Sequence, residues 1–481
     1  MKILMISPEL APLAKTGGLG DMVASLSKAL AADGHDVRIF IPRYGNIPTG
    51  DDWSVHPDPV AVHLTPQHTE FCRVWTAPFG QARVHLLEYN NFFGSGEIYG
   101  QRTDHAYRFA FQSLAALDFC LQTDWVPDIV HAHDWTAGLA PVILNTTRRS
   151  TALGRAASIF TVHNLQHQGL VTADVLRYLY LPPWLLTADN LECYGGVNML
   201  KGALYHATKI TTVSPTYAQE IQTPAYGFGL DPVLRFRAAD LVGILNGIDS
   251  TEWNPATDSL APVRFTAKDL SGKAVCKAAL QRETGLEVDA ATPLFGVVAR
   301  LYEQKGLDLL AAILPELLGR ARMQVVLLGA GEKYLEGRFQ WLAKCFPGQL
   351  SVRIGYDNAL AHRIEAGADF FIMPSRFEPC GLNQLYSMSY GTLPIVRATG
   401  GLADSVQPWT SRPAKGTGLF FGDATESALL DAMHRALRLY FDYPADFAQL
   451  RQNAMTQDFS WNLSAASYAR IYDSALRTRR G

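Results

Sequence analysis

The chain has 481 residues, of which 48% are hydrophobic and 18% charged, and its formal net charge at pH 7 is −3. This length and composition predict a folded protein of two or three domains and exclude a disordered or collagen-like chain. The small net charge gives no reason to expect nucleic acid or a membrane surface as a partner.

The N-terminal sequence and the cysteines indicate a cytoplasmic protein. The first ten residues, MKILMISPEL, contain one lysine and too short an apolar core for a signal peptide, so we predict a first strand there. No run of about 18 apolar residues occurs, so no membrane span is expected. The 6 cysteines are scattered without a C-x-x-C pair, which predicts reduced thiols and neither a disulfide framework nor a zinc site.

The chain begins with a strand, a glycine-rich turn and a helix. Ile3–Ser7 is the strand, Lys15–Asp21 (KTGGLGD) is the turn, and apolar periodicity continues to Leu30. A glycine turn that opens a helix presents backbone N–H groups and the positive end of the helix dipole to phosphate. The turn is neither G-x-G-x-x-G nor G-K-[ST], so it matches neither the dinucleotide fingerprint nor a P-loop. Asn90–Asp104, which contains Tyr99, is predicted to be a mobile aromatic surface loop.

Further along, buried strands alternate with helices, and each strand ends at a polar residue or a turn. Because the carboxyl ends of parallel strands meet at one edge of a sheet, the residues that follow them should reach the same crevice. We place one domain at 1–245, a second at 246–456, and a C-terminal segment at 457–481 with a last helix at Ser464–Arg480. The predicted strands are Val37–Ile41, Arg83–Tyr89, Asp128–His133, Ser158–His163, Ile210–Ser214, Leu241–Leu245, Leu294–Ala299, Val325–Leu328 and Leu350–Ile354.

The segment Asp369–Asp404 carries the strongest functional signal. Asp369–Pro374 and Leu393–Arg397 are predicted strands, the first followed by a loop with Glu378 and the second by Gly400-Gly401. Both loops therefore belong at the carboxyl edge of a parallel sheet, where open α/β sheets bind ligands. An acid fixed beside a glycine turn that suits phosphate indicates chemistry on a phosphorylated substrate.

One short repeat links the two halves of the chain. Thr16–Asp21 reads TGGLGD and Thr399–Asp404 reads TGGLAD, and each copy follows a buried strand and opens a helix. The repeat predicts two Rossmann-like domains whose glycine loops face each other across a cleft and enclose a diphosphate.

Three basic residues near strand-end turns are candidates for binding that diphosphate, namely Lys15, Arg300 and Lys305. A phosphate requires permanent cations and N–H donors, although each of these residues taken alone is more often a solvated surface charge. For two further candidate site residues, a purely structural role is an equally simple explanation. His163 at a strand end can be a hydrogen-bonded core histidine, and Trp135 can be either a core residue or a platform for stacking a sugar.

A series of motifs in a fixed order resembles those of bacterial glycogen synthases, the retaining glucosyltransferases that use ADP-glucose. The resemblance runs from the first strand to the last helix. It rests on KTGGLGD (Lys15–Asp21), HAHDW (His131–Trp135), VHN (Val162–Asn164), TTVSPTYA (Thr211–Ala218), ILNGID (Ile244–Asp249), EQKGLD (Glu303–Asp308), PSRFEPCGL (Pro374–Leu382) and GTLPIVR (Gly391–Arg397).

The resemblance implies an α/β fold of the GT-B type, with two Rossmann-like domains facing across a cleft and a C-terminal helix that crosses back to the first domain. The first domain would bind the acceptor and the second the nucleotide sugar. The implied reaction transfers glucose from ADP-glucose to the non-reducing 4-hydroxyl of an α-1,4-glucan, either glycogen or a malto-oligosaccharide, with retention of configuration. ADP-glucose would be the donor substrate, and neither a cofactor nor a metal would be required.

The resemblance also implies roles for individual residues. The catalytic residues would be Glu378, His163, Arg300, Lys305 and Asp21, with His163 near the anomeric carbon of the glucose and Glu378 on its hydroxyls. Arg300 and Lys305 would also bind the donor, together with Lys15, Gly18, Asn246, Tyr356, Cys380, Gly400 and Gly401. The acceptor would contact Glu9, Tyr99, Asp134 and Trp135.

The chain departs from the family pattern at Thr136, where a histidine is usual, at Gln166-His167 in place of Ala-Tyr, and at Asn383 in place of a threonine. These departures concern the acceptor rather than the reaction. Three other functions stay open at this stage. They are an NAD-dependent dehydrogenase, which would need the absent G-x-G-x-x-G, a non-catalytic glucan-binding protein, and a phosphorylase that uses a pyridoxal cofactor.

Overall fold

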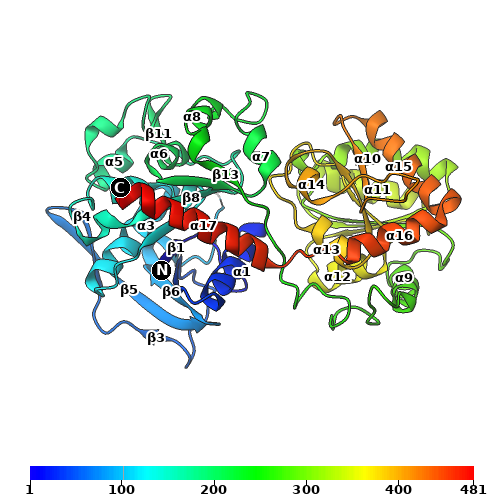
Figure 1. The fold of residues 1–481 in the computed structure, drawn as a ribbon, viewed down its shortest axis with the longest axis horizontal. Coiled ribbons are helices and arrows are strands. Elements are labelled where there is room, and N and C mark those ends of the chain that lie inside the picture. Colours follow the sequence, from blue (N-terminus) through cyan, green and yellow to red (C-terminus); the bar gives the residue numbers. More distant parts are fainter. Residues whose placement is uncertain (101, 481) are drawn as a thin grey trace. The chain divides into compact units, whose positions relative to one another are not determined.

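The computed structural model describes residues 1–100 and 102–480. Gln101, within the predicted loop Asn90–Asp104, and Gly481, at the end of the predicted C-terminal segment, lie outside the described residues. The chain divides into two compact units (Figure 1), one formed by Met1–Gly247 with the last helix and the other by Ile248–Ser460. Asn246, predicted at the start of the second domain, belongs to the first unit.

The first unit is built on a mostly parallel sheet. Its strands are β1 (Lys2–Ile6), β2 (Asp36–Pro42), β3 (Ser54–Val55), β4 (Val60–Thr65), β5 (His68–Phe79), β6 (Ala82–Glu88), β7 (Ile129–His133), β8 (Ala157–Val162), β12 (Lys209–Thr212) and β13 (Leu241–Gly243). They follow the order β13-β12-β8-β7-β1-β2-β6-β5-β3, and β4 pairs with β5. The strands from β13 to β6 run parallel, whereas β5 is antiparallel to β6, β4 and β3.

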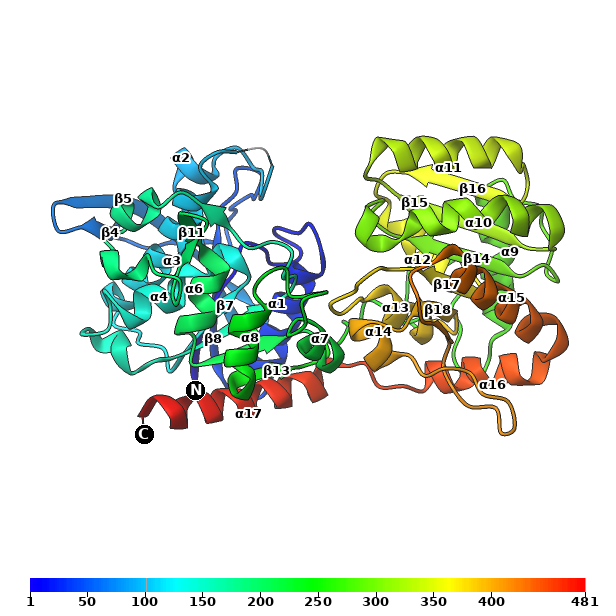
Figure 2. The ribbon, with the colours of Figure 1, turned by 90° about the horizontal axis from the view of Figure 1, so that it is seen from above.

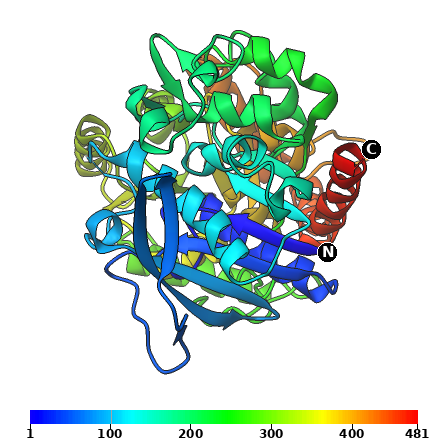
Figure 3. The same cartoon turned by 90° about the vertical axis from the view of Figure 1, so that its left-hand side faces the viewer.

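The parallel strands of this sheet match the sequence-based prediction. Strands β3, β4 and β5 also belong to the sheet but were not predicted. The β4–β5 hairpin extends the edge of the sheet (Figure 3, blue strands in the foreground). A small antiparallel sheet, also not predicted, has the order β10-β11-β9. Its strands are β9 (Leu170–Val171), β10 (Glu192–Cys193) and β11 (Gly196–Asn198).

The helices of the first unit cover the sheet and build the loops above it. They are α1 (Gly18–Ala32), α2 (Asn90–Phe93), α3 (His105–Gln122), α4 (Leu139–Asn145), α5 (Asp174–Tyr178), α6 (Met199–His206), α7 (Pro215–Glu220), α8 (Asp231–Phe236) and the 3₁₀ turns η1 (Trp135–Ala137), η2 (Ala152–Arg155), η3 (Pro183–Leu185) and η4 (Ala238–Asp240). In α1 the apolar residues recur at helical spacing and are buried, as a helix that packs on a sheet requires. The segment predicted as an aromatic surface loop starts with α2, and its Phe93 is fully buried.

The last helix, α17 (Trp461–Arg480), belongs to the first unit although the second unit precedes it in the chain. It packs against α1 and β8 (Figure 2). Tyr468 and Tyr472 are buried on its inner side, and the Tyr472 hydroxyl lies 2.8 Å from Nδ1 of His131 in β7. The predicted return of the C-terminal helix to the first domain is thus confirmed.

The second unit is an all-parallel sheet with helices on both faces. Its strands are β14 (Leu294–Val298), β15 (Gln324–Gly329), β16 (Leu350–Ile354), β17 (Phe370–Met373), β18 (Leu393–Arg397) and β19 (Leu419–Phe421), in the order β16-β15-β14-β17-β18-β19. Its helices are α9 (Ser271–Glu283), α10 (Leu307–Arg320), α11 (Lys333–Cys345), α12 (Asn358–Gly367), α13 (Asn383–Ser389), α14 (Gly400–Ser405), α15 (Glu426–Asp442), α16 (Pro444–Met455) and the 3₁₀ turn η5 (Glu303–Lys305). The predicted class, α/β with two Rossmann-like sheets, is confirmed.

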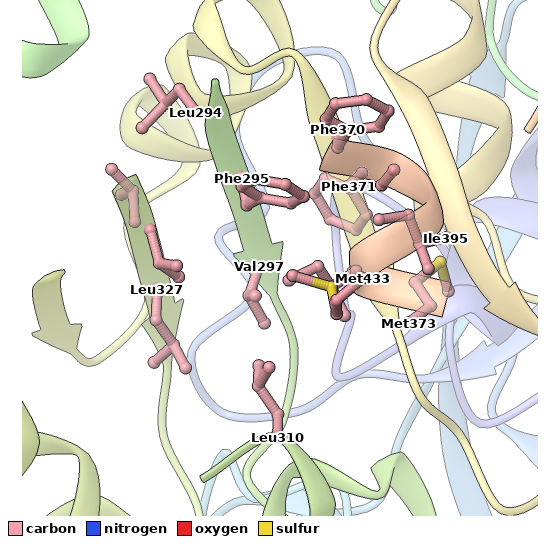
Figure 4. Close-up of a cluster of buried hydrophobic side chains, with 14 of the residues drawn as sticks. Leu294, Phe295, Val297, Leu310, Leu327, Phe370, Phe371, Met373, Ile395 and Met433 are labelled. Carbon is pink, nitrogen blue, oxygen red and sulfur yellow. The ribbon is translucent and has the colours of Figure 1, made fainter. Parts of the chain in front are cut away.

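The strands β14 and β17 are continuous apolar runs because helices bury both of their faces. Figure 4 shows the side chains of β14, β15 and β17 meeting Leu310 and Met433 from the covering helices. The rings of Phe295 and Phe370 are stacked, with centroids 5.0 Å apart. This packing fixes the strand ends from which the functional loops start. Over the described ranges, no helix has both the length and the hydropathy that a bilayer span requires.

Candidate active site

Each sheet reverses its strand order at one pair of neighbouring strands. In the first unit the reversal lies between β1 and β7, and in the second between β14 and β17. At such a point the connections diverge to opposite faces of the sheet and leave a crevice at the carboxyl ends of the strands. The predicted site residues follow these strands, so each unit carries its own cluster of functional side chains.

In the first unit, Glu9 organises the loop between β1 and α1. Its side chain is 2% exposed. Oε2 accepts hydrogen bonds from the backbone N–H of Thr16 (2.7 Å) and Gly17 (3.3 Å), and Oε1 accepts them from the hydroxyls of Thr16 and Tyr99, both at 2.8 Å. Glu9 and Tyr99, which were predicted as acceptor contacts, therefore lie together. The carboxylate also holds the glycine turn that precedes α1.

The two charged residues of that turn form an ion pair. Lys15 Nζ lies 2.7 Å from Oδ1 of Asp21, and their side chains are 41% and 26% exposed. Gly18, the first residue of α1, lies between them in the sequence. An exposed pair of this kind contributes little to stability. Lys15 can therefore exchange its carboxylate partner for a phosphate at little cost in folding free energy.

Asp134 and His163, at the ends of β7 and β8, are joined through the backbone. Asp134 has φ 56°, a left-handed conformation that a non-glycine residue adopts rarely. In this conformation its Oδ1 accepts a hydrogen bond of 2.7 Å from the backbone N–H of His163. Strain of this kind persists where the surrounding structure enforces it, often at functional sites.

The sequence analysis missed His133, which contacts His163 directly. Nδ1 of His133 lies 3.2 Å from Nε2 of His163, so the orientation of the His163 ring depends on His133. The ring of His131 lies beside that of His133, with centroids 4.1 Å apart and planes tilted by 35°. The H-x-H spacing could have revealed this, because alternate residues of a strand lie on the same face. Burial lowers the pKa of His163 to about 3, so its ring is neutral at pH 7.

The carboxyl of Asp134 titrates far above its ordinary range. Burial raises its pKa from 3.8 to about 7, against the opposing effect of hydrogen bonds from the backbone of His163 and Asn164. The negative charge of Glu9 raises it further. Folded Asp134 thus retains its proton over a pH range in which the unfolded chain has lost it.

This difference predicts a pH-dependent stability. Because the folded state binds the extra proton between pH 3.8 and about 7, the free energy of unfolding falls as pH rises through that range. We expect Asp134→Asn to remove this part of the pH dependence. The free energy of unfolding of the variant should therefore increase relative to that of the parent as pH rises. Urea denaturation across the range measures it, with Asp51→Asn at an exposed loop position as the control. If the free energy of unfolding varied with pH in the same way in the parent and in Asp134→Asn, the result would contradict a raised pKa of Asp134.

Trp135 is partly exposed and is supported from one side. Its indole lies on Gly169, where an added Cβ would be 2.5 Å from Cε3 of the ring. The rings of Phe109 and His105 meet it edge-on, with centroids 5.4 Å and 6.2 Å away. The remaining surface borders an open pocket of the first unit. Trp135 is thus not a fully buried core residue.

Asn246 follows β13 at the end of the first unit. It is 6% exposed, and within residues 1–100 and 102–480 its Oδ1 has no hydrogen-bond partner. Buried polar atoms are nearly always paired in native proteins. An unpaired amide oxygen here fits a residue whose partner is a substrate group.

In the second unit, Lys305 and Glu378 are brought together at the reversal of the sheet. Lys305 Nζ lies 2.5 Å from Oε2 of Glu378, and the side chains are 19% and 7% exposed. The hydroxyl of Ser375 donates a second hydrogen bond of 2.9 Å to the same oxygen. Glu378 is thereby held rigidly, with a cation beside it, at the carboxyl end of β17.

The glycine turn after β18 packs directly on the loop that carries Glu378. A Cβ on Gly400 would lie 1.9 Å from the carbonyl oxygen of Glu378, and one on Gly401 would lie 2.1 Å from that of Cys380. The N–H of Gly401 donates to the carbonyls of Glu378 (3.0 Å) and Pro379 (3.2 Å). Glycine is therefore required here for close backbone approach, and the Gly401 N–H is already used within the protein.

The other predicted donor residues lie at the same carboxyl edge with different exposure. Arg300 is exposed after β14, with its guanidinium 5.7 Å from the centre of the Tyr302 ring. Cys380 is 7% exposed. Tyr356 follows the edge strand β16 and is 83% exposed, and its hydroxyl donates a hydrogen bond of 3.3 Å to Oδ1 of Asn358.

Two positions at which the sequence departs from the family pattern have structural partners. Asn383 donates a 2.6 Å hydrogen bond from Nδ2 to the carbonyl of Val298 and so ties α13 to β14. Thr136 is 1% exposed, and its hydroxyl lies 3.4 Å from the carbonyl of His133. In the part of the chain that the structure describes, no cluster of three or more histidine, cysteine, aspartate or glutamate side chains is placed to hold a metal ion.

Comparison with known proteins identifies the family. Residues 2–236 match the starch synthase catalytic domain family, and residues 284–454 match the glycosyl transferases group 1 family. Glycogen synthase from Anaeromyxobacter sp. (strain Fw109-5) is 47% identical to this chain, over 98% of the chain and 99% of the relative. The chain belongs to the glycogen synthase family. Glycogen synthase from Myxococcus xanthus is a further relative, at 46% identity over 98% and 99% of the two chains.

Solved structures agree with membership of the glycogen synthase family. The catalytic domain of starch synthase IV from Arabidopsis thaliana, bound to ADP and acarbose, superimposes with a TM-score of 0.92 at 36% identity, covering 99% of both chains. Sucrose-phosphate synthase from Thermosynechococcus elongatus has the same fold with a TM-score of 0.62 at 18% identity. The predicted GT-B fold and the assignment to the hexosyltransferases are both confirmed by these comparisons.

Proposed function

We propose that this member of the glycogen synthase family transfers glucose from ADP-glucose to the non-reducing 4-hydroxyl of an α-1,4-glucan, with retention at the anomeric carbon. The ADP and acarbose bound to the related starch synthase support a nucleotide diphosphate donor and a glucan acceptor. A cytoplasmic location is supported by the six cysteines, all of which are free thiols.

The observation that carries the proposal is the 2.5 Å pair between Lys305 Nζ and Glu378 Oε2. Glucosyl transfer develops negative charge on the departing diphosphate and positive charge at the anomeric carbon. A cation and a carboxylate held side by side complement both charges. Because such groups are fixed before the reaction, they stabilise the transition state without reorganising.

The role of each charged side chain in glucosyl transfer follows from its position and its contacts. Arg300 and Lys305 bind the diphosphate and stabilise it as it leaves, and Lys15 adds a third cation. Glu378, whose Oε2 is bound by Lys305 and Ser375, orients the glucose hydroxyls, and we assign it no role as a nucleophile. The bond from C1 to the phosphate oxygen breaks, the acceptor 4-oxygen bonds to C1 on the same face, and its proton passes to the departing phosphate.

The neutral ring of His163 fits a position close to the developing positive charge at C1. A protonated imidazole there would oppose the transition state, and burial prevents protonation at pH 7. Glu9, Tyr99, Asp134 and Trp135 serve the acceptor. Asn246, with its unpaired amide oxygen, contacts the nucleotide sugar. The exposed ring of Tyr356 is suited to stacking on the adenine.

Replacing Trp135 distinguishes an acceptor platform from a core residue. We expect Trp135→Ala to keep its melting temperature within a few degrees of the parent, because the indole is partly exposed. The KM for glycogen should rise about tenfold through the loss of a stacked aromatic ring, while the KM for ADP-glucose stays unchanged. Trp135→Phe should recover part of the loss. If Trp135 were a core residue, its replacement by alanine would instead lower the free energy of unfolding by about 3–5 kcal/mol, and this result would contradict a role as acceptor platform.

Release of nucleoside diphosphate tests the reaction itself. Purified protein is given ADP-glucose or UDP-glucose, with and without maltoheptaose, and free ADP or UDP is measured. We expect ADP release that depends on the acceptor, with new α-1,4 linkages visible by NMR. Equal kcat/KM for the two donors would contradict the proposed donor. Absence of transfer from either donor would contradict the proposed function.

A further inference from the structure

The first unit contains an open pocket of about 820 Å³ with Trp135 in its lining. Three segments line it, namely Gln166–Leu170, the β10–β11 hairpin with Tyr194, and the loop Phe228–Leu230. All of them belong to the first unit, so this pocket is complete within that unit. Of the residues that line it, the roles proposed above use Trp135 alone.

Two aromatic residues in this pocket have a backbone conformation that their side chains disfavour. Tyr194 and Phe228 have φ of 52° and 47°, and each is followed by a glycine with positive φ, Gly195 and Gly229. Bulky residues rarely adopt positive φ, and a two-residue hairpin turn of this kind normally starts with asparagine, aspartate or glycine. Tyr194 is 98% exposed and Phe228 is 39% exposed, so burial does not offset the strain at Tyr194. An exposed aromatic side chain at a strained position indicates a function in binding.

Hydrogen bonds fix both aromatic turns to the segment that supports Trp135. Gln168 Nε2 donates to the carbonyl of Phe228 (2.9 Å), and Asn198 Nδ2 donates to Oε1 of Gln168 (2.7 Å). In the hairpin, the N–H of Gly195 donates to Oε1 of Glu192 (2.9 Å). The pocket is therefore formed before any ligand binds, which lowers the entropic cost of binding.

The chemistry of the lining does not favour a phosphorylated ligand. Its lysine, Lys201, donates from Nζ to the carbonyl of Glu192 (2.6 Å), and the Glu192 side chain adds a negative charge. What remains is a set of aromatic faces interleaved with amide and imidazole groups. Glucose rings match this set, because they have apolar C–H faces for stacking and hydroxyls around the rim for hydrogen bonds.

We infer that this pocket binds the glucan chain beyond the glucose units at the reacting end, and that Tyr194 and Phe228 make the enzyme select long acceptors. The inference rests on the proposed function and adds to it the chain-length preference. Short malto-oligosaccharides reach Trp135 but not the two aromatic turns. Longer chains gain stacking on Tyr194 and Phe228, so they bind more tightly at the same reaction rate.

The test uses Tyr194→Asn and Phe228→Asn in the full-length protein. Asparagine tolerates positive φ, so these variants remove the rings while relaxing the turns, and their melting temperatures should not fall. We expect the KM for maltoheptaose and for glycogen to rise about threefold to tenfold per ring, with the double variant lower in affinity than either single one. The KM for maltose as acceptor and for ADP-glucose should not change. Phe236→Asn, at an aromatic position that is 77% exposed outside this pocket, is the matched control.

Direct binding separates this inference from the proposed reaction. Calorimetric titration of maltoheptaose into the parent should show binding that is weakened in Tyr194→Asn and Phe228→Asn, whether or not transfer is measured. Unchanged maltoheptaose affinity in both variants, or equal losses for maltose and maltoheptaose, would overturn the inference while leaving the reaction intact. A parent that binds maltoheptaose but transfers no glucose would overturn the proposed function alone.

Discussion

Glu378→Gln is expected to lower kcat by about 10²–10³-fold, the effect of removing one preorganised transition-state contact. The substitution keeps the size of the side chain and its hydrogen bond from Ser375, but removes the negative charge beside Lys305. The loss should fall mainly on kcat, because the charge at the anomeric carbon develops only in the transition state. Steady-state kinetics with ADP-glucose and maltoheptaose measure it.

The matched control is Glu303→Gln, two residues before Lys305. The Glu303 side chain is 82% exposed and lies 3.9 Å from Arg376, so its loss should leave kcat within a factor of about two. Both variants should give the circular dichroism spectrum of the parent. Full activity in Glu378→Gln would remove Glu378 from the catalytic residues.

Lys305→Ala is expected to lower kcat by a similar factor of about 10²–10³ and also to weaken ADP binding by about 10- to 100-fold. Both parameters change because the ammonium group meets phosphate oxygens in the bound donor and, more strongly, in the transition state. Removing it also leaves Glu378, 5% exposed, without its cationic partner. Isothermal titration of ADP measures the binding loss separately from the kinetics.

Lys333→Ala provides the control for this variant. Lys333 lies in the same unit, its side chain is 89% exposed, and it pairs with Glu336 on the surface of α11. ADP affinity and kcat should be those of the parent. If Lys305→Ala also bound ADP as the parent does, the cationic contact to the diphosphate would have to come from other residues.

Much of this arrangement could be predicted because parallel strands leave a strong pattern in the sequence. A strand buried on both faces is a short apolar run, as in Phe370–Met373, and the residues after it must lie at the carboxyl edge of the sheet. That rule alone placed Glu378 and Lys305 near one another. It could not give the 2.5 Å contact between them, which depends on how the η5 turn and the loop after β17 pack together.

Other features left a weaker pattern or none. Helix α3 is buried almost all round, including Arg108 at 0% exposure, so it lacks the polar face by which a helix is recognised. The strands β9, β10 and β11 are two or three residues long and have no periodicity to detect. Strand β4, by contrast, alternates buried residues with partly or fully exposed ones along Val60–Thr65 and could have been predicted.

The return of α17 to the first unit has a consequence for how the protein is made. One hydrogen-bond partner of His131 in the core is Tyr472, which leaves the ribosome only after the whole second unit has been made. Until then the nascent first unit lacks a helix that covers α1 and β8, and the surface that will receive Tyr468 and Tyr472 is exposed. The second unit, Ile248–Ser460, has no such dependence and can fold as soon as it emerges. A chain truncated just after Ser460 would therefore retain an intact second unit and fail in the part that was synthesised first.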